Sequence, residues 1–184
     1  RAAARLLAPV DAAAGGALDG LAAASVAVAV LAYPPDAVAG APAFDGTGVL
    51  VAPDNARLLK AATFLSSKWG HLAGDPFLVR ASAGRYGDAR IDALDDGELV
   101  ARLHHDLAAL TGVAAPPIGA LVQRWPEAMP QLEVGHRERM AGITDRLQSH
   151  PGVVVAGAGY DGVGISAAVR SGEAAAARLV ESSA

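Results

Sequence analysis

A glycine-rich turn near the end of the chain restricts the possible folds more than any other segment. Residues 151–156 are small and apolar, which predicts a buried strand, and residues 157–165 (GAGYDGVGI) lead into a helix of small residues. Gly157, Gly159 and Gly162 match the G-x-G-x-x-G spacing of dinucleotide-binding turns. Such a turn normally opens a βαβ unit, but residues 166–184 leave room for one helix only. We therefore expect this turn to close a nucleotide-binding domain that begins elsewhere.

The backbone amides at the start of the last helix are candidate ligand-binding groups. Amides near Val163, Gly164 and Ile165 should lack partners within the helix and lie at the positive end of its dipole, which favours negative charge. Gly162 and Gly164 would let a flat ligand or a pyrophosphate approach the backbone. A tight packing turn between a strand and a helix explains the same glycines, so the spacing alone leaves both interpretations open.

Composition excludes several classes of function. The net charge is −4 and no run of Lys or Arg occurs, which argues against a nucleic-acid partner. The chain has no Cys, and therefore no disulfide, thiolate ligand or cysteine nucleophile. The longest apolar run, 21–33, falls short of the roughly 20 residues that span a bilayer. No Ser/His/Asp triad, Walker loop or H-E-x-x-H motif suggests hydrolysis or phosphoryl transfer, and we expect no metal site.

The middle of the chain combines strand and helix patterns, which predicts an α+β fold. Residues 25–33 are apolar on both faces and end at two prolines, as expected for a strand inside a sheet. Asp95 and Glu98 predict a capping box at the start of a helix that lies across this sheet. Further strands are predicted at 48–51, 61–69, 77–81 and 117–125, the first three as an antiparallel meander.

A proline-bounded segment, 125–131, predicts the boundary between two parts of the chain, 1–130 and 131–184. Before it, Asp11 and Gly15-Gly16 should separate two short helices at the N-terminus. After it, residues from Gly135 onward carry Met140, Ile143 and Leu147 at helical spacing. The last helix then presents a narrow stripe formed by Ile165, Ala168, Gly172, Ala175 and Leu179.

Several aromatic and basic residues have both a structural and a functional interpretation. Trp125 lies at the end of a predicted strand, where it can belong to the core or lie along a planar ligand. Residues 68–71 (KWGH) resemble an exposed loop more than a site. His104 and His105 point about 100° apart on a helix and are interpreted as surface residues. For His136, at a helix start, a neutral hydrogen-bonded role is expected.

Four segments together resemble the C-terminal part of the FAD-dependent porphyrinogen oxidases of haem synthesis, the protoporphyrinogen/coproporphyrinogen oxidase family. They are residues 61–69, 123–131, 134–136 and 151–172, which occur in the family's order and spacing. The resemblance covers most of the chain from about Ser25 onward. It implies an amine-oxidase-like flavoprotein with a mixed or antiparallel substrate-domain sheet and covering helices in 1–130. It also implies that 131–184 form a helix–strand–helix that completes a Rossmann-like FAD domain.

The resemblance also implies a cofactor, a reaction and partners. FAD would contact the backbone of Val163, Gly164 and Ile165, and Trp125 would lie against it. The reaction would be oxygen-dependent oxidation of a porphyrinogen with release of hydrogen peroxide, with coproporphyrinogen III the favoured substrate. Arg80, Arg85 or Lys68 would be candidates to pair with substrate propionates, because carboxylates need cations at a pocket rim. No catalytic residue is identified.

The chain begins at Arg1 and lacks the family's N-terminal glycine fingerprint, so we expect a truncation or processing point and a partner portion of the same protein. The expected location is the cytoplasm, with peripheral membrane association through segments outside these residues as the alternative. Three other functions stay open. They are a protoporphyrinogen IX oxidase, another amine-oxidase-like enzyme acting on amines or carotenoids, and a non-catalytic remnant of the fold.

Overall fold

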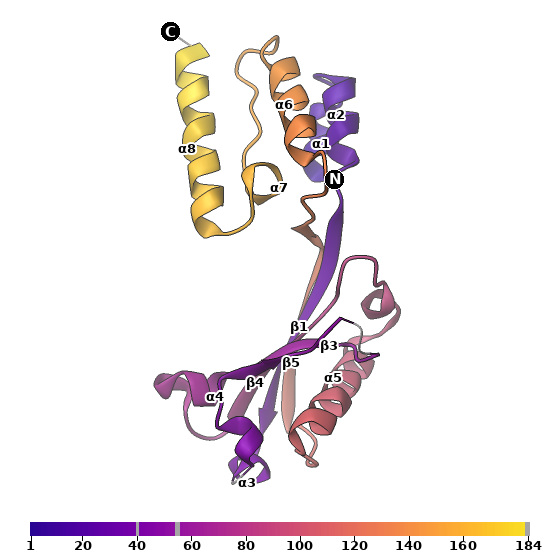
Figure 1. The fold of residues 1–184 in the computed structure, drawn as a ribbon, viewed down its shortest axis with the longest axis vertical. Coiled ribbons are helices and arrows are strands. Elements are labelled where there is room, and N and C mark those ends of the chain that lie inside the picture. The colour runs from indigo at the N-terminus through magenta and orange to yellow at the C-terminus, as the bar shows by residue number, and fades with distance from the viewer. Residues whose placement is uncertain (40, 54–55, 183–184) are drawn as a thin grey trace. The chain divides into compact units, whose positions relative to one another are not determined.

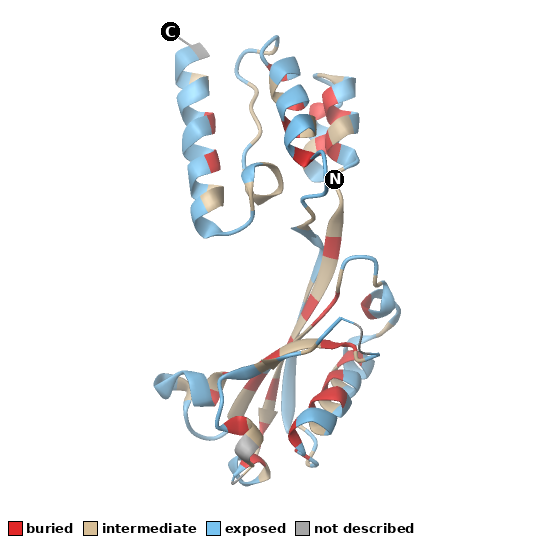
Figure 2. Ribbon diagram, viewed as in Figure 1, coloured by how far each residue is buried: buried red, intermediate tan, exposed pale blue. Residues whose placement is uncertain are grey.

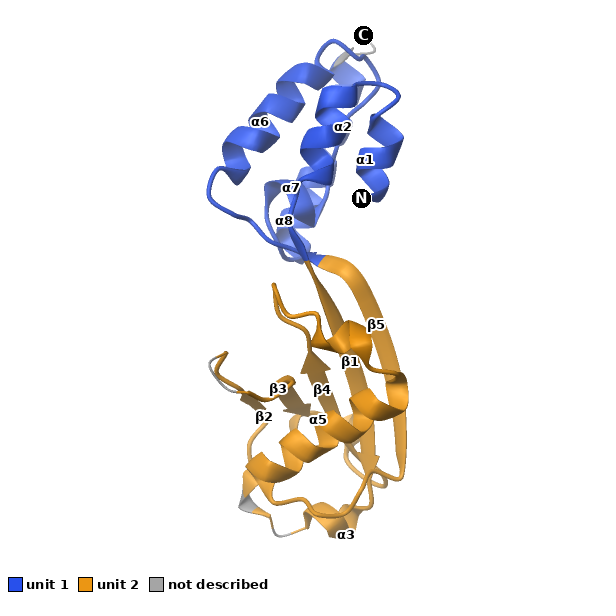
Figure 3. Ribbon diagram, turned by 90° about the vertical axis from the view of Figure 1, so that its right-hand side faces the viewer, with its two compact units in different colours: residues 1–23, 129–184 blue, residues 24–128 orange. Residues whose placement is uncertain are grey.

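A computed structural model describes residues 1–39, 41–53 and 56–182. Its contacts divide the chain into two compact units (Figure 3). Unit 1 comprises Arg1–Ala23 and Met129–Ala184, and unit 2 comprises Ala24–Ala128. The chain therefore leaves unit 1 after its first helices and returns to it for the last third. The α+β class expected from the sequence is confirmed.

Unit 2 is built on a five-stranded sheet with the order β2-β3-β4-β1-β5 (Figure 1). The β2/β3, β3/β4 and β1/β4 pairs are antiparallel, which confirms the meander. Ile118 N donates to Ala32 O at one end of β5, and Gln131 N donates to Ala22 O at the other, so β5 runs antiparallel to β1. The strands are β1 (Ala23–Tyr33), β2 (Gly48–Leu50), β3 (Leu59–Phe64), β4 (Phe77–Ala83) and β5 (Gly119–Pro130).

The strand predicted over 61–69 is wrong in its second half. β3 ends at Phe64, and the short helices α4 (Leu65–Lys68) and η2 (Gly70–Leu72) follow. The hydroxyl of Ser66 donates to Leu72 O at 2.7 Å and accepts from Leu78 N at 2.9 Å. These side-chain bonds to the backbone take the place of strand pairing in this segment.

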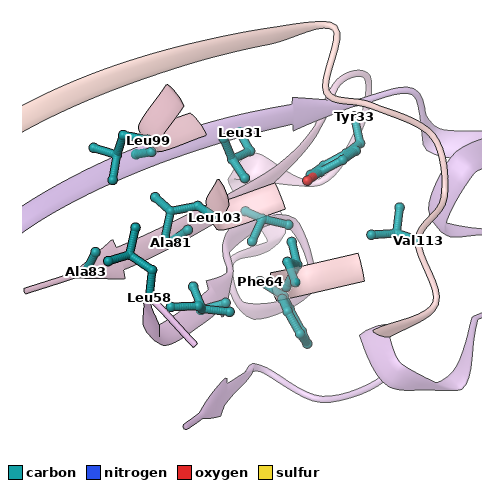
Figure 4. Close-up of a cluster of buried hydrophobic side chains, with 14 of the residues drawn as sticks. Leu31, Tyr33, Leu58, Phe64, Ala81, Ala83, Leu99, Leu103 and Val113 are labelled. Carbon is teal, nitrogen blue, oxygen red and sulfur yellow. The ribbon is translucent and has the colours of Figure 1, made fainter. Parts of the chain in front are cut away.

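Helix α5 (Asp96–Thr111) packs on one face of the sheet and encloses the larger core (Figure 4). Its capping box is confirmed, since Glu98 N donates to the Asp95 carboxylate at 2.8 Å and Asp95 N donates to the Glu98 carboxylate at 2.9 Å. Gly112 ends the helix with φ of 79°, a conformation that favours glycine. The side chains that fill this core include Leu31, Tyr33, Leu58, Phe64, Val79, Leu99, Leu103 and Leu107. Shorter elements of the unit are α3 (Pro35–Val38), η1 (Pro42–Phe44) and η3 (Arg90–Ala93).

Unit 1 has its own smaller core between the N-terminal helices and α6 (Figure 2). Asp11 caps α2 by accepting from Ala14 N at 2.8 Å. Gly15 was expected to interrupt a helix but lies inside α2. A Cβ at this position would come within 2.7 Å of Ala8 Cα, so the close packing requires glycine here. The helices are α1 (Ala2–Leu7), α2 (Ala12–Asp19), α6 (His136–Leu147), α7 (Ala158–Asp161) and α8 (Ile165–Ser182).

The boundary between the two compact units differs from the division into 1–130 and 131–184 that the sequence predicts. Residues 1–23 belong with the C-terminal segment, because Leu7 and Leu18 share a buried cluster with Ile143 of α6. The break on the C-terminal side, between Ala128 and Met129, lies two residues from the expected position.

The strand predicted over 151–156 is absent from the structure. Residues 153–156 adopt no regular secondary structure, and the side chains of Val153, Val154 and Val155 are half-buried. Every strand in the described ranges belongs to the single sheet built on unit 2, so this segment has no strand beside it with which to pair. The C-terminal part is therefore helix–coil–helix here. Across the ranges that the structure describes, no helix combines the length and apolar composition needed to cross a bilayer.

Candidate functional site

The C-terminal turn is held closed by one buried serine. Gly157, Gly162 and Gly164 have φ values of 131°, 126° and 107°, which L-residues with side chains rarely adopt. The hydroxyl of Ser171, on α8, accepts from Gly157 N at 2.9 Å and donates to the Asp161 carboxylate. Ser171 is only 3% exposed. One side chain therefore joins Gly157, at the start of the turn, and Asp161, in its middle, to the helix that follows.

Helix α6 holds the same turn from the other side. The Nε2 atom of His136 donates a hydrogen bond to Tyr160 O at 2.9 Å, and the imidazole is buried. The hydrogen-bonded role expected for His136 is thus confirmed. Burial raises the pKa of the Tyr160 phenol, so this ring stays protonated and packs against the unit 1 core. Helix α7 is thus held through the carbonyl of Tyr160 as well as through the carboxylate of Asp161.

The start of α8 presents unpaired backbone donors to open space. The first bond of the helix runs from Ala168 N to Gly164 O at 3.0 Å, so the preceding amides have no intrahelical acceptor. A Cβ on Gly164 would meet no heavy atom within 4 Å. Val163 and Ile165 flank it with side chains 54% and 87% exposed. Amides with exposed apolar neighbours suit a flat ligand that carries negative charge on one edge.

A groove of about 910 Å³ lies between this turn and α6. Tyr160, Asp161 and Gly162 line one side, and His136 and Met140 line the other. The predicted small-residue stripe on α8 differs from the structure, because Ile165 and Gly172 are exposed while Ser171 and Ala175 are buried. The buried face of α8 thus includes Ser171, which was not predicted as a site residue.

The second candidate surface is the face of the sheet opposite α5, here called the second face. Residues Ala27, Ala29 and Leu31 of β1 are buried under α5, so alternation places Val28 and Val30 on the second face, where they are half-buried. On β5, Val122 packs against the core, which puts Leu121 and Trp125 on the second face. These two are 71% and 53% exposed. Trp125 is therefore not a core residue.

One cation lies in the middle of the second face. Arg80 of β4 pairs with Val30 of β1 and Thr63 of β3, and it is exposed. Thr63 pairs in turn with Gly48 of β2, and the neighbouring Leu50 is 91% exposed. The second face is thus an apolar, partly exposed surface with a guanidinium near its centre.

The three cations considered for substrate carboxylates differ in their surroundings. Arg85 donates to Val51 O at 3.1 Å, and Lys68 Nζ lies 5.4 Å from the centroid of the Trp69 ring. Residues 68–71 are exposed, as expected, but they are not a loop, because Lys68 ends α4 and Gly70 and His71 belong to η2. The guanidinium of Arg80 makes no hydrogen bond or ion pair within the described ranges of the chain.

The interpretation of His104 as a surface residue is wrong. Its Nδ1 atom lies 3.0 Å from the hydroxyl of Tyr33, which is fully buried. Burial, with the neighbouring His105, lowers the pKa of His104, and burial raises the pKa of Tyr33 to about 12. Both groups are therefore uncharged at neutral pH and join the end of β1 to α5. His105 is exposed, as expected.

The four residues predicted to contact a cofactor fall in different units. Val163, Gly164 and Ile165 belong to unit 1, whereas Trp125 belongs to unit 2. The structure brings the first three together at the start of α8. Two structural residues were missed, Ser171 and the buried Asp106, whose carboxylate accepts from the amides of residues 58 and 59 at 2.7 and 3.0 Å. Neither has a local sequence signal, since their partners are distant along the chain.

Comparison with known proteins gives consistent matches over most of the chain. The sequence profile of the family described as flavin containing amine oxidoreductase matches residues 2–180. Coproporphyrinogen III oxidase of Mycobacterium leprae is 40% identical over 158 residues, which are 86% of this chain and 33% of that protein. The enzyme of the same name from Bacillus subtilis is 35% identical over 133 residues, 71% of this chain and 28% of that protein. The chain spans about a third of the length of these curated relatives.

Solved structures show the same fold. An Exiguobacterium protein, provisionally assigned as a protoporphyrinogen oxidase, superposes with a TM-score of 0.78 at 27% identity, over 89% of this chain and 36% of that one. Reduced UDP-galactopyranose mutase superposes with a TM-score of 0.53 at 12% identity, over 73% of this chain and 28% of that one, a likeness of fold alone.

Proposed function

Because the chain belongs to the flavin-containing amine oxidoreductase family, we propose that it forms part of an FAD-dependent oxidase of haem biosynthesis that converts coproporphyrinogen III to coproporphyrin III. Relatives named coproporphyrinogen III oxidase, at 40% and 35% identity, support this choice of substrate. Oxygen is the proposed acceptor and hydrogen peroxide the second product. We place the enzyme in the cytoplasm, where it acts with the remaining portion of the same protein.

The residues at the start of α8 fit the proposed cofactor. FAD has a flat ring system with carbonyl oxygens along one edge, and it supplies the two-electron oxidation when bound. The backbone amides near Val163, Gly164 and Ile165 would hold that edge, and the open space over Gly164 admits a planar group. Ser171 and His136 would fix these donors before the cofactor binds, which lowers the ordering cost of binding.

We propose that the two units have different functions, one in cofactor binding and the other in substrate binding. Unit 1, with the C-terminal turn, would contribute to the FAD domain, as expected for 131–184. Unit 2 would bind substrate, as expected for most of 1–130, with the second face of its sheet as the binding surface. An exposed apolar surface with one central cation suits a tetrapyrrole, which combines an apolar ring with carboxylates. Trp125, at one end of this face, would lie against the cofactor or the ring.

The open space at Gly164 is the observation that carries the cofactor assignment, and it defines the test. In the complete protein, Gly164→Leu should abolish the visible flavin absorption of the purified protein, because a branched side chain would occupy the approach to the amides. Gly112→Leu is a matched control, since Gly112 also has a positive φ and an unobstructed Cβ direction but ends α5 in unit 2. It should keep its flavin.

Retention of stoichiometric flavin by the Gly164→Leu protein would contradict this placement of the cofactor. The reaction itself is tested by the fluorescence of porphyrin formed under oxygen. Turnover of amines without turnover of porphyrinogens would indicate another amine-oxidase-like enzyme. A colourless complete protein that forms no porphyrin would indicate a non-catalytic remnant. Preference for protoporphyrinogen IX over coproporphyrinogen III would change the proposed substrate but not the proposed oxidation.

A further inference from the structure

We infer that Arg80 recognises the substrate by pairing with a carboxylate of the porphyrinogen. This inference rests on the proposed function. Its neighbours on β4, Val79 and Ala81, are fully buried under α5, so alternation along the strand directs Arg80 to the second face. Arg80 lies opposite Val30 and Thr63, on interior strands of the sheet. The cation is therefore central on this surface and not at its edge.

The fold does not use the charge of Arg80. Two other arginines of unit 2 make structural ion pairs: Arg90 pairs with Asp88 at 2.7 Å, and Arg124 pairs with Asp96 at 2.8 Å. Arg85 is bound to a backbone carbonyl. The guanidinium of Arg80 makes no such contact anywhere in residues 1–39, 41–53 and 56–182. Its donors are thus available for a ligand.

The surroundings of Arg80 select the kind of ligand. Val28, Val30 and Leu121 offer apolar contact on the same face, which suits the ring of a tetrapyrrole. A guanidinium is planar and presents parallel N–H donors, so it binds a carboxylate through two hydrogen bonds. A propionate at the rim of the ring satisfies both requirements at once. Arg85 and Lys68, which the sequence left as equal candidates, have their cations engaged elsewhere.

The test compares variants of Arg80 in the complete protein. Arg80→Met keeps the length of the side chain and removes the charge. We expect the Kd for coproporphyrin III, measured by fluorescence titration, and the KM for coproporphyrinogen III to rise roughly ten-fold or more, because a hydrogen-bonded charge pair of this kind is lost. The kcat should change little. Arg80→Lys, which retains a cation, should recover part of the affinity.

Arg102→Met is the matched control. Arg102 is an exposed arginine of α5, on the other side of the sheet, and its replacement should leave Kd and KM unchanged. Flavin content and thermal unfolding establish that each variant is folded. If the Met variant is unstable, Arg80→Gln, which is polar and uncharged, should show the same loss of affinity.

The outcomes separate this inference from the proposed function. A wild-type protein that oxidises coproporphyrinogen III, combined with unchanged Kd and KM in Arg80→Met, would overturn the role of Arg80 alone. An equal loss in the Lys and Met variants would also overturn it, because a charge contact predicts partial rescue. A flavin-containing wild-type protein that neither binds coproporphyrin III nor oxidises the porphyrinogen would overturn the proposed function as well.

Discussion

Replacing Ser171 by Ala tests the closure of the C-terminal turn. The substitution removes the acceptor for Gly157 N and the donor to Asp161 from a site that is 3% exposed. At about 1 kcal/mol net for each hydrogen bond, the closed turn should lose about 2 kcal/mol relative to locally open forms. That difference corresponds to a roughly 30-fold larger open population, since 1.4 kcal/mol is a factor of ten. Alanine is a good helix former, so α8 itself should persist.

Amide hydrogen exchange in the complete protein measures this population directly. The Gly157 amide should exchange roughly 30-fold faster in Ser171→Ala, because exchange follows the local opening equilibrium. The flavin dissociation constant should rise in parallel, since the donors of the turn would no longer be ordered in advance. Ser166→Ala is the control, as Ser166 is an exposed serine of the same helix. Unchanged protection of Gly157 would refute the idea that Ser171 holds the turn, whatever happens to activity.

Two further predictions concern stability. Asp106→Ala should lower the free energy of unfolding by about 2–4 kcal/mol, because the amides of Leu58 and Leu59 would lose their buried acceptor. Urea unfolding measures this loss. Hydrogen bonds from Arg146 and from Ala14 N lower the pKa of Asp11 to about 2. The ionised carboxylate of Asp11 therefore stabilises the fold fully above about pH 4, and this contribution is lost as the pH falls from about 4 to about 2. Thermal unfolding against pH should show this loss, and Asp11→Asn should remove it; an unchanged pH profile in that variant would contradict the assignment.

Local sequence patterns predicted the secondary structure correctly wherever the stabilising contacts are close in sequence. The capping box of α5 is formed by Asp95 and Glu98, three residues apart, and the sequence identified it completely. The antiparallel meander followed from short links between apolar segments. The helix at 136–147 followed from the spacing of Met140, Ile143 and Leu147, all of which are buried.

Long-range contacts explain what the sequence could not indicate. Residues 153–156 have the composition of a strand, but a strand also needs a paired neighbour, which the described sheet does not provide. The predicted strand continued to Trp69, but the chain enters α4 after Phe64, where the hydroxyl of Ser66 bonds to the backbone of Leu72 and Leu78. His104 appeared to be exposed because nothing near it in sequence points to Tyr33, 71 residues away. The start of α8 was identified as a candidate site from the sequence, whereas the serine that holds its turn was not.

The way unit 2 is inserted into unit 1 has a consequence for folding. Unit 1 is joined by contacts between residues far apart in sequence, such as the bond from Arg146 to Asp11, 135 residues away. Closing an unstructured loop of that length would carry a large entropy cost and slow folding. However, β1 and β5 lie side by side, so a folded unit 2 already brings its two ends together. The substrate-binding unit we propose would thus act as a short, preformed connection, and we expect the two parts of unit 1 to join only after the sheet has formed.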